Sequence, residues 1–201
     1  MSISNFELLI GRIAPGPASP LNRRVVQGYF LTITNLDNRP VQLVIKMTSP
    51  AGGGTRQLDI GLPATASNTN VVFDNGTSND VAIPCVITPS AVNTIAYRTQ
   101  TDNADPLKNL QPIQPQQTML ITVLPNVGSF NFSGLGIEIR GYLEIRQEFK
   151  ADGTLQPPAK LVITAEHRGT FLDNNFPGIG DYDQISYALP FGNGAAVQEI
   201  K

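Results

Sequence analysis

Residues 136–150 read GIEIRGYLEIRQEFK, and this stretch decides the fold class. Apolar and polar side chains alternate along it. Because successive side chains of a strand point to opposite faces, a period of two predicts a half-buried β-strand over residues 136–150. Gly141 falls on the apolar face, where a glycine predicts a bulge or a tight bend. The other apolar positions on that face are Ile137, Ile139, Leu143 and Ile145.

Working outward from this strand, shorter runs with the same alternation occur along the whole chain and are rich in Val, Ile, Thr and Phe. Two of them are separated by Asn35-Leu36-Asp37-Asn38, which favours a turn, so they predict an antiparallel hairpin over residues 25–48. The run at 117–124 is apolar on both faces and is predicted either to be buried on both sides or to lie centrally in a sheet. The runs lie at residues 6–13, 25–35, 41–48, 58–62, 70–73, 81–87, 92–98, 117–124, 160–170 and 184–189.

Helices are not expected, because 16 prolines and 18 glycines leave few long uninterrupted windows. One helix-start signal is Asp105 followed by Pro106, inside the segment 100–117 that is also the candidate sub-boundary of the chain. About ten short strands predict an all-β, antiparallel two-sheet sandwich, immunoglobulin-like or jelly-roll-like, with little helix. We expect a single domain over residues 1–201, a length that allows a large apolar core.

The composition limits the classes of partner. The net charge is −2, charged residues make up 15% of the chain, well below the usual quarter, and no basic run is present. Nucleic-acid binding is therefore not expected. A weakly charged surface repels its own copies less, which favours association with itself or with other proteins. Because no apolar run approaches the length of a membrane helix, we expect no membrane insertion. Because the first residues lack signal-peptide features, we expect a cytoplasmic location by default, with export by a route that leaves no cleaved signal as the alternative.

Candidate catalytic side chains are few, since the chain has one cysteine, Cys85, and one histidine, His167. A single cysteine cannot form a disulfide within the chain, and its apolar neighbours predict a buried thiol. His167 follows Leu161, Ile163 and Ala165 on the apolar face of its strand, which predicts a buried, hydrogen-bonded imidazole. One histidine and one cysteine do not make a usual zinc site. The sequence thus favours a protein that is not an enzyme, and a hydrolase with dispersed carboxylates is the weakest alternative.

The acidic loop at residues 173–183 contains the best cluster of metal-binding oxygens. Ca²⁺ prefers roughly six to eight oxygen ligands from carboxylates, amides and carbonyls. The match to an EF-hand loop fails, because Pro177 stands where a ligand is required, and an ordinary polar loop is the favoured interpretation. Ca²⁺ is the one candidate cofactor, and its candidate ligands are Asp173, Asn175, Asp181 and Asp183.

The polar face of the strand at 136–150 alternates in the sign of its charges. Opposite charges that are neighbours along or across a sheet stabilise it by about a few tenths of a kcal/mol each. A solvated strand face is the favoured interpretation, and a self-complementary subunit interface is the alternative. The candidate interface residues are Glu138, Arg140, Tyr142, Glu144 and Arg146.

No catalytic or cofactor motif stands out from these patterns. The leading hypothesis is a non-catalytic structural or interaction protein that self-associates or belongs to a larger assembly. The alternative is a binding module for a small molecule or a carbohydrate, dependent on Ca²⁺ if the acidic loop binds that ion. The absence of tryptophan argues against a carbohydrate ligand, because sugar-binding sites rely on large aromatic faces.

Overall fold

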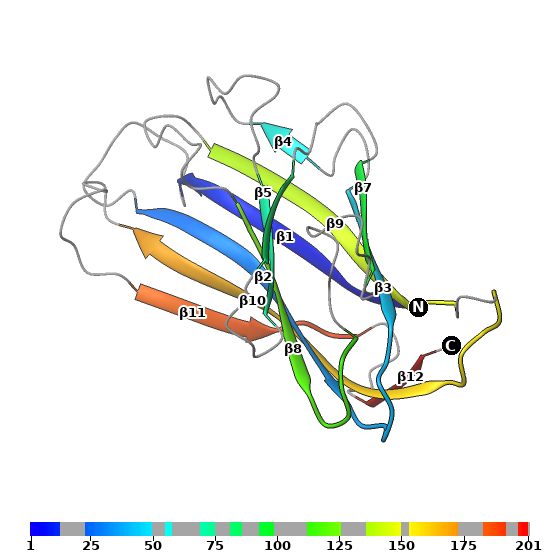
Figure 1. Ribbon diagram of the computed structural model, residues 1–201. Coiled ribbons are helices and arrows are strands. Elements are labelled where there is room, and N and C mark those ends of the chain that lie inside the picture. The colour runs from blue at the N-terminus through cyan, green and yellow to red at the C-terminus, as the bar shows by residue number, and fades with distance from the viewer. Residues whose placement is uncertain are drawn as a thin grey trace.

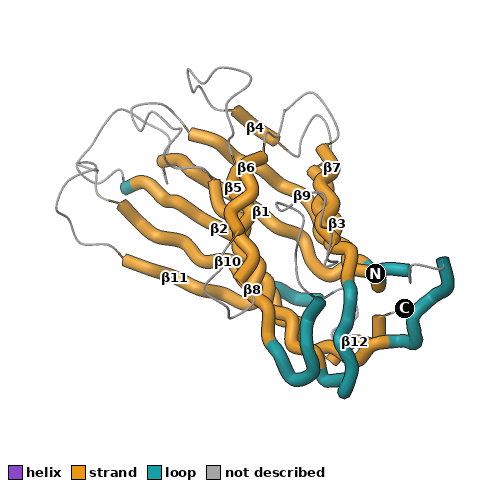
Figure 2. Tube along the Cα trace, viewed as in Figure 1, coloured by secondary structure: helices purple, strands orange, loops and turns teal. Residues whose placement is uncertain are grey.

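The predicted all-β, antiparallel class is confirmed by the computed structural model. It describes residues 1–12, 23–49, 55–57, 69–74, 81–85, 93–98, 112–125, 136–149, 153–172, 183–191 and 197–200. No helix occurs among these residues, and their strand pairings are all antiparallel. Figures 1 and 2 show the long strands lying side by side in a twisted arrangement.

The described residues form twelve strands, where the sequence predicts about ten. Their longest path of hydrogen-bonded neighbours has the order β6-β5-β8-β2-β1-β9-β3-β7, while β10 pairs with β2, β11 and β12 pair with β10, and β4 pairs with β9. The strands are β1 (Ser2–Arg12), β2 (Arg24–Asn35), β3 (Leu43–Ser49), β4 (Thr55–Gln57), β5 (Thr69–Asp74), β6 (Val81–Cys85), β7 (Asn93–Arg98), β8 (Thr118–Pro125), β9 (Gly136–Gln147), β10 (Ala159–Leu172), β11 (Asp183–Ala188) and β12 (Val197–Ile200).

The sheet divides into two branches at β2. One edge of β2 pairs with β10 along its whole length. The other edge is shared, because residues 24–27 pair with β1 and residues 29–34 pair with β8. The branch through β1 continues to β9, β3 and β7, and the branch through β8 continues to β5 and β6. Gly28 lies at the division, where an added Cβ would stand 2.3 Å from Cδ2 of Leu124.

The core draws on both branches. Inward side chains of β1, β2, β3, β8, β9 and β10 belong to one hydrophobic cluster. Burying each Leu or Ile side chain contributes about 1.5–3 kcal/mol, so this cluster supplies most of the driving force for folding. The alternation of buried and more exposed residues in β8, and in β10 from residue 159 to residue 170, is the predicted period of two. The fully buried members include Leu31, Ile33, Ile121, Ile139, Leu143, Ile145, Leu161 and Ile163.

The predicted hairpin over residues 25–48 is wrong. Strands form at both places, but β2 pairs with β10, β1 and β8, whereas β3 pairs with β7 and β9. The intervening residues cross from one branch to the other. Asn35, which is fully buried, holds this crossing: its Nδ2 donates to the carbonyls of Arg39 (2.8 Å) and Ile113 (3.0 Å), and its Oδ1 accepts from the amide of Asp37. Local turn chemistry is therefore present, but the strand partners are distant in sequence.

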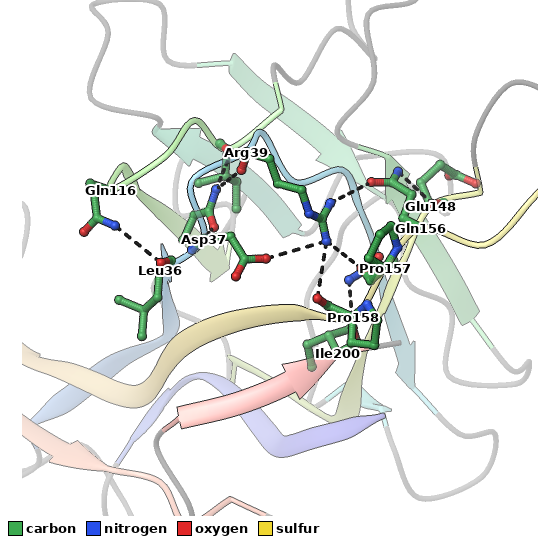
Figure 3. A network of polar contacts seen from close by, with 12 residues as sticks. Leu36, Asp37, Arg39, Gln116, Glu148, Gln156, Pro157, Pro158 and Ile200 are labelled. Atoms are coloured by element: carbon green, nitrogen blue, oxygen red, sulfur yellow. Dashed lines mark hydrogen bonds and ion pairs between the residues drawn. The ribbon is translucent and has the colours of Figure 1, made fainter.

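Further contacts fasten the crossing to distant segments (Figure 3). The guanidinium of Arg39 donates to the carbonyls of Pro157 and Pro158 and to Oε1 of Gln156. Gln156 in turn donates to the carbonyl of Glu148, at 3.0 Å, just beyond the end of β9. These bonds tie the crossing to the segment that leads into β10.

Gly141 in β9 is required by close approach and not by a bulge. The one register shift between β1 and β9 lies between Ser2 and Ser4, so the first of the two predicted alternatives, a bulge at Gly141, is wrong. An added Cβ at Gly141 would stand 2.2 Å from the carbonyl oxygen of Thr48 and 2.6 Å from Cζ of Phe6. Glycine therefore allows β3 and the Phe6 ring to pack directly on the β9 backbone.

Of the remaining predictions, one is confirmed and several concern residues outside the described part of the chain. β8 pairs on one side with β2 and on the other with β5, which confirms an internal strand at 117–124. The predicted strand at 58–62, the helix-start signal at 105–106 and most of the segment 100–117 lie outside the described residues. Cys85 ends β6, but its side chain is also outside the description. The single-domain expectation stays a prediction.

Candidate functional site

β11 is an exposed strand at the margin of the sheet (Figure 1). It pairs with β10 over its whole length, and β10 is its one strand neighbour among the described residues. All six of its residues are exposed. Two of them are large and apolar, since Ile185 is 49% exposed and Tyr187 is 42% exposed.

The backbone of β11 alternates between groups that bond to β10 and groups that face outward. The amide of Leu189 donates to the carbonyl of Ala165 at 2.8 Å. Because bonded and non-bonded pairs alternate in an antiparallel ladder, every second residue before Leu189 also bonds to β10. The N–H and C=O groups of the residues between them point away from β10, to the margin of β11 that is open among the described residues. These residues are Gln184, Ser186 and Ala188.

Behind this margin, a ring of hydrogen bonds joins β1, β2, β10 and β11. His167 Nε2 accepts from the backbone N–H of Glu7 at 2.9 Å, and His167 Nδ1 lies 3.1 Å from the hydroxyl of Tyr187. That hydroxyl donates to Oε1 of Gln27 at 3.1 Å. Nε2 of Gln27 completes the ring by donating to the carbonyl and the carboxylate of Glu7, each at 3.2 Å.

The ring determines where His167 carries its proton. Because Nε2 accepts a hydrogen bond, the neutral imidazole carries its proton on Nδ1 and donates it to Tyr187. Burial lowers the pKa of His167, against the opposing effect of the Glu7 carboxylate, and this favours the neutral form. Burial also raises the pKa of the Tyr187 hydroxyl, and the charge of Glu7 acts in the same direction. The hydrogen-bonded ring thus holds β11 through the neutral side chains of His167, Tyr187 and Gln27, each of which donates and accepts in one direction.

A buried tyrosine supports the ring from the core side. Tyr29 is fully buried, its hydroxyl lies 2.7 Å from Oγ of Ser4, and burial raises its pKa well above the ordinary range. Its ring meets the imidazole of His167 edge-on, with centroids 6.0 Å apart. The imidazole in turn meets the ring of Tyr187 edge-on at 5.3 Å. These three rings fix the orientation of the imidazole by packing as well as by hydrogen bonds.

The outer face of β10 and β11 carries a linked set of polar side chains beside a groove. Ser186 Oγ donates to Glu166 at 2.6 Å, which lowers the pKa of that carboxyl, and Glu166 also pairs with Arg168. The Arg168 guanidinium stacks on the ring of Phe30, 4.4 Å from its centroid. The groove has a volume of about 530 Å³ and is lined by β2, β8, β10 and β11, including Gly28 at the division of the sheet.

Sequence reasoning found part of this site. His167 is buried and hydrogen-bonded, as its place on an apolar strand face predicts. Glu166 points to the opposite face, as parity requires. The roles of Glu7, Gln27 and Tyr187 were missed, because they depend on which strands are neighbours. A polar residue on an otherwise apolar strand face, such as Gln27 before Tyr29, was the one signal available.

The five predicted interface residues lie on the outward face of β9. Arg140 pairs with Glu7 and Glu138, and Glu144 pairs with Lys46 on β3. These charges are therefore compensated within the chain. The role of Glu138, Arg140, Tyr142, Glu144 and Arg146 in a subunit interface stays a prediction.

The predicted Ca²⁺ ligands are mostly outside the description. Asp183 begins β11, where its carboxylate pairs with Arg23. The other three, Asp173, Asn175 and Asp181, lie outside the described residues. Where side chains are described, no group of three or more His, Cys, Asp or Glu residues is placed to hold a metal ion. Ca²⁺ binding stays a prediction.

Comparisons with known proteins leave the function open. No family model matches the chain, and no curated protein matches it. Among solved structures, the chain is similar to Clostridium perfringens delta-toxin at 9% identity, covering 98% of this chain and 80% of that one, with a TM-score of 0.23. It is also similar to the Clostridium perfringens NetB toxin in the membrane inserted form at 6% identity, covering 97% and 99%, with a TM-score of 0.11. Likenesses at these scores carry no argument about fold or function. In the part of the chain that the structure describes, no helix is long and apolar enough to cross a membrane.

Proposed function

We propose that this chain is a non-catalytic structural or interaction protein that self-associates or joins a larger assembly through the open margin of β11. The observation that carries the proposal is that all six residues of β11 are exposed while its outward N–H and C=O groups face away from β10. Such a strand is a ready template for pairing with another strand.

Stable monomers usually block their edge strands, and β11 lacks several of the common devices within the described residues. Natural proteins protect edges with Lys, Pro, bulges or inward charges. β11 contains no Lys and no Pro, and its register with β10 is continuous from one end to the other. Its one charged residue, Asp183, stands at its first position and is paired with Arg23. Among the described residues, no strand other than β10 pairs with β11, which supports an assembly role.

The architecture proposed for this role is a two-sheet sandwich in which the two branches face each other. The single hydrophobic cluster shared by β1, β9 and β3 with β2, β8 and β10 supports it. The presence of one cysteine is compatible with a reducing compartment, so we propose a cytoplasmic location.

Light scattering coupled to size-exclusion chromatography, over a series of concentrations, tests the proposal with a matched pair of variants. Ser186→Pro removes one outward N–H and adds a ring at the margin without removing a bond to β10, so the variant is expected to fold. Ser186→Ala loses the same hydroxyl but keeps the N–H. The wild type and Ser186→Ala are expected to associate and Ser186→Pro to remain monomeric. A wild type that is monomeric at every concentration would refute self-association through β11.

A small-molecule binding role is the second candidate, favoured by the groove of about 530 Å³ on the outer face. Its volume lies within the usual range for ligand pockets, roughly 300–1,000 Å³. A thermal-shift screen of the wild type tests this role, with Arg168→Ala as the control for specific binding. A compound that stabilises the wild type but not the variant would support the groove as a ligand site.

A further inference from the structure

We infer that the partner of β11 is β11 of a second copy of the chain, paired antiparallel about a twofold axis at Ser186. The inference rests on the proposed function and specifies its partner and register. It follows from two properties of the strand, which are the direction of its backbone groups and the chemistry of the side chains that would face one another.

The outward backbone groups select this register. They belong to Gln184, Ser186 and Ala188, and in an antiparallel pair outward residues must stand opposite outward residues to bond. Centring the axis on Ser186 places Gln184 opposite Ala188 of the second copy and Ser186 opposite its own equivalent. All three outward residues of each copy then bond, which gives about six hydrogen bonds. A shift of one residue opposes outward to inward groups, and a shift of two removes one of the three bonded pairs.

The side chains are self-complementary in the same register. Ile185 stands opposite Tyr187 of the second copy, twice over because of the twofold axis. These are the two large apolar residues that β11 exposes, and an aromatic side chain opposite a β-branched one is a favourable cross-strand pair. Asp183 stands opposite Leu189, so no two like charges face each other.

The cycle of hydrogen bonds around His167 holds the side chain of Tyr187 in place for this contact. The Tyr187 hydroxyl is hydrogen-bonded to His167 and Gln27, so the aromatic side chain of Tyr187 is already fixed before a partner binds. Ordering an exposed side chain on binding normally costs conformational entropy, and a side chain that is fixed in advance avoids much of that cost. Ser186 is small and bonded to Glu166, so it leaves room for its equivalent in the second copy.

Disulfide trapping tests the register directly, in a Cys85→Ser background that removes the native thiol. In a hydrogen-bonded antiparallel pair, opposed Cα atoms lie about 5.5 Å apart, within the range of a disulfide. Ser186→Cys alone is therefore expected to form a covalent dimer under mild oxidation. Gln184→Cys alone is not, because the two copies of residue 184 would lie about 14 Å apart along the strands. A mixture of Gln184→Cys and Ala188→Cys chains is expected to form the mixed dimer.

The outcomes separate this inference from the proposed function. Preferential disulfides between Ser186→Cys and either Gln184→Cys or Ala188→Cys would overturn the register and leave pairing through β11 intact. Association of the wild type without a disulfide in any of these variants would overturn the β11 contact and leave an assembly role. A monomer at every concentration, together with no disulfide, would overturn both.

Discussion

Removing the hydroxyl of Tyr187 tests the hydrogen-bonded ring most sharply. In Tyr187→Phe, the Nδ1–H of His167 loses its acceptor and Oε1 of Gln27 loses its donor. Both residues are buried, with exposures of 6% and 8%. An unsatisfied buried donor or acceptor costs about 1–3 kcal/mol, and water can replace part of the lost bonding because Tyr187 itself is 42% exposed. We therefore expect the free energy of unfolding to fall by about 1–3 kcal/mol.

Urea denaturation of the wild type and the variant measures this change as a lower midpoint with an unchanged slope. The matched control is Tyr142→Phe, which removes a hydroxyl from the outward face of β9 and is expected to change stability by less than about 0.5 kcal/mol. Because His167 is the one histidine of the chain, its imidazole nitrogens can be followed by NMR without ambiguity. An unchanged midpoint in Tyr187→Phe, or a wild-type imidazole protonated on Nε2, would refute the proposed cycle of hydrogen bonds around His167.

Three further predictions use the same denaturation assay. Burial lowers the pKa of His167 below its unfolded value, so the stabilising effect of the neutral imidazole is complete above that unfolded pKa, about 6.5, and is lost as the pH falls below it. The urea concentration at the unfolding midpoint should therefore be lower at pH 5.5 than at pH 7, and this difference should be smaller in His167→Gln. An NMR titration of His167 with a midpoint at or above pH 6.5 would contradict this prediction. Gly141→Ala should lower the free energy of unfolding by about 3 kcal/mol, because the added methyl group meets the rigid carbonyl of Thr48. Gly28→Ala should lower it by less, because its methyl group meets the end of the Leu124 side chain. Equal losses of stability in the two variants would argue against the close approach at β9. Asn35→Ala should cost about 2 kcal/mol or more through the loss of the bonds that hold the crossing, and a change within about 0.5 kcal/mol would show that other contacts hold it.

Sequence patterns predicted what depends on neighbours along the chain. The alternation in residues 136–150 and 160–170 assigned both strands and their buried faces, including the burial of His167. The segment after Asn35 was correctly assigned as a turn region. Strand partners were not predictable, because pairing is decided by the whole core, and so the hairpin over residues 25–48 was wrong.

The candidate site was less predictable than the fold for the same reason. The ring depends on Glu7, Gln27 and His167 meeting across three strands that are far apart in sequence. The exposed margin of β11 likewise depends on its pairing with β10 and on the absence of a second described neighbour. The charged face of β9 was visible in the sequence, but its ion pairs with Glu7 and Lys46 come from adjacent strands.

Amide hydrogen exchange, measured residue by residue at several protein concentrations, tests pairing through β11 most directly. The amides of Ile185 and Tyr187 bond to β10 and should be protected at every concentration. Those of Gln184, Ser186 and Ala188 face the margin and should gain protection as the concentration rises, in step with the molar mass. Exchange at these three amides that is independent of concentration while the molar mass increases would contradict pairing through this strand.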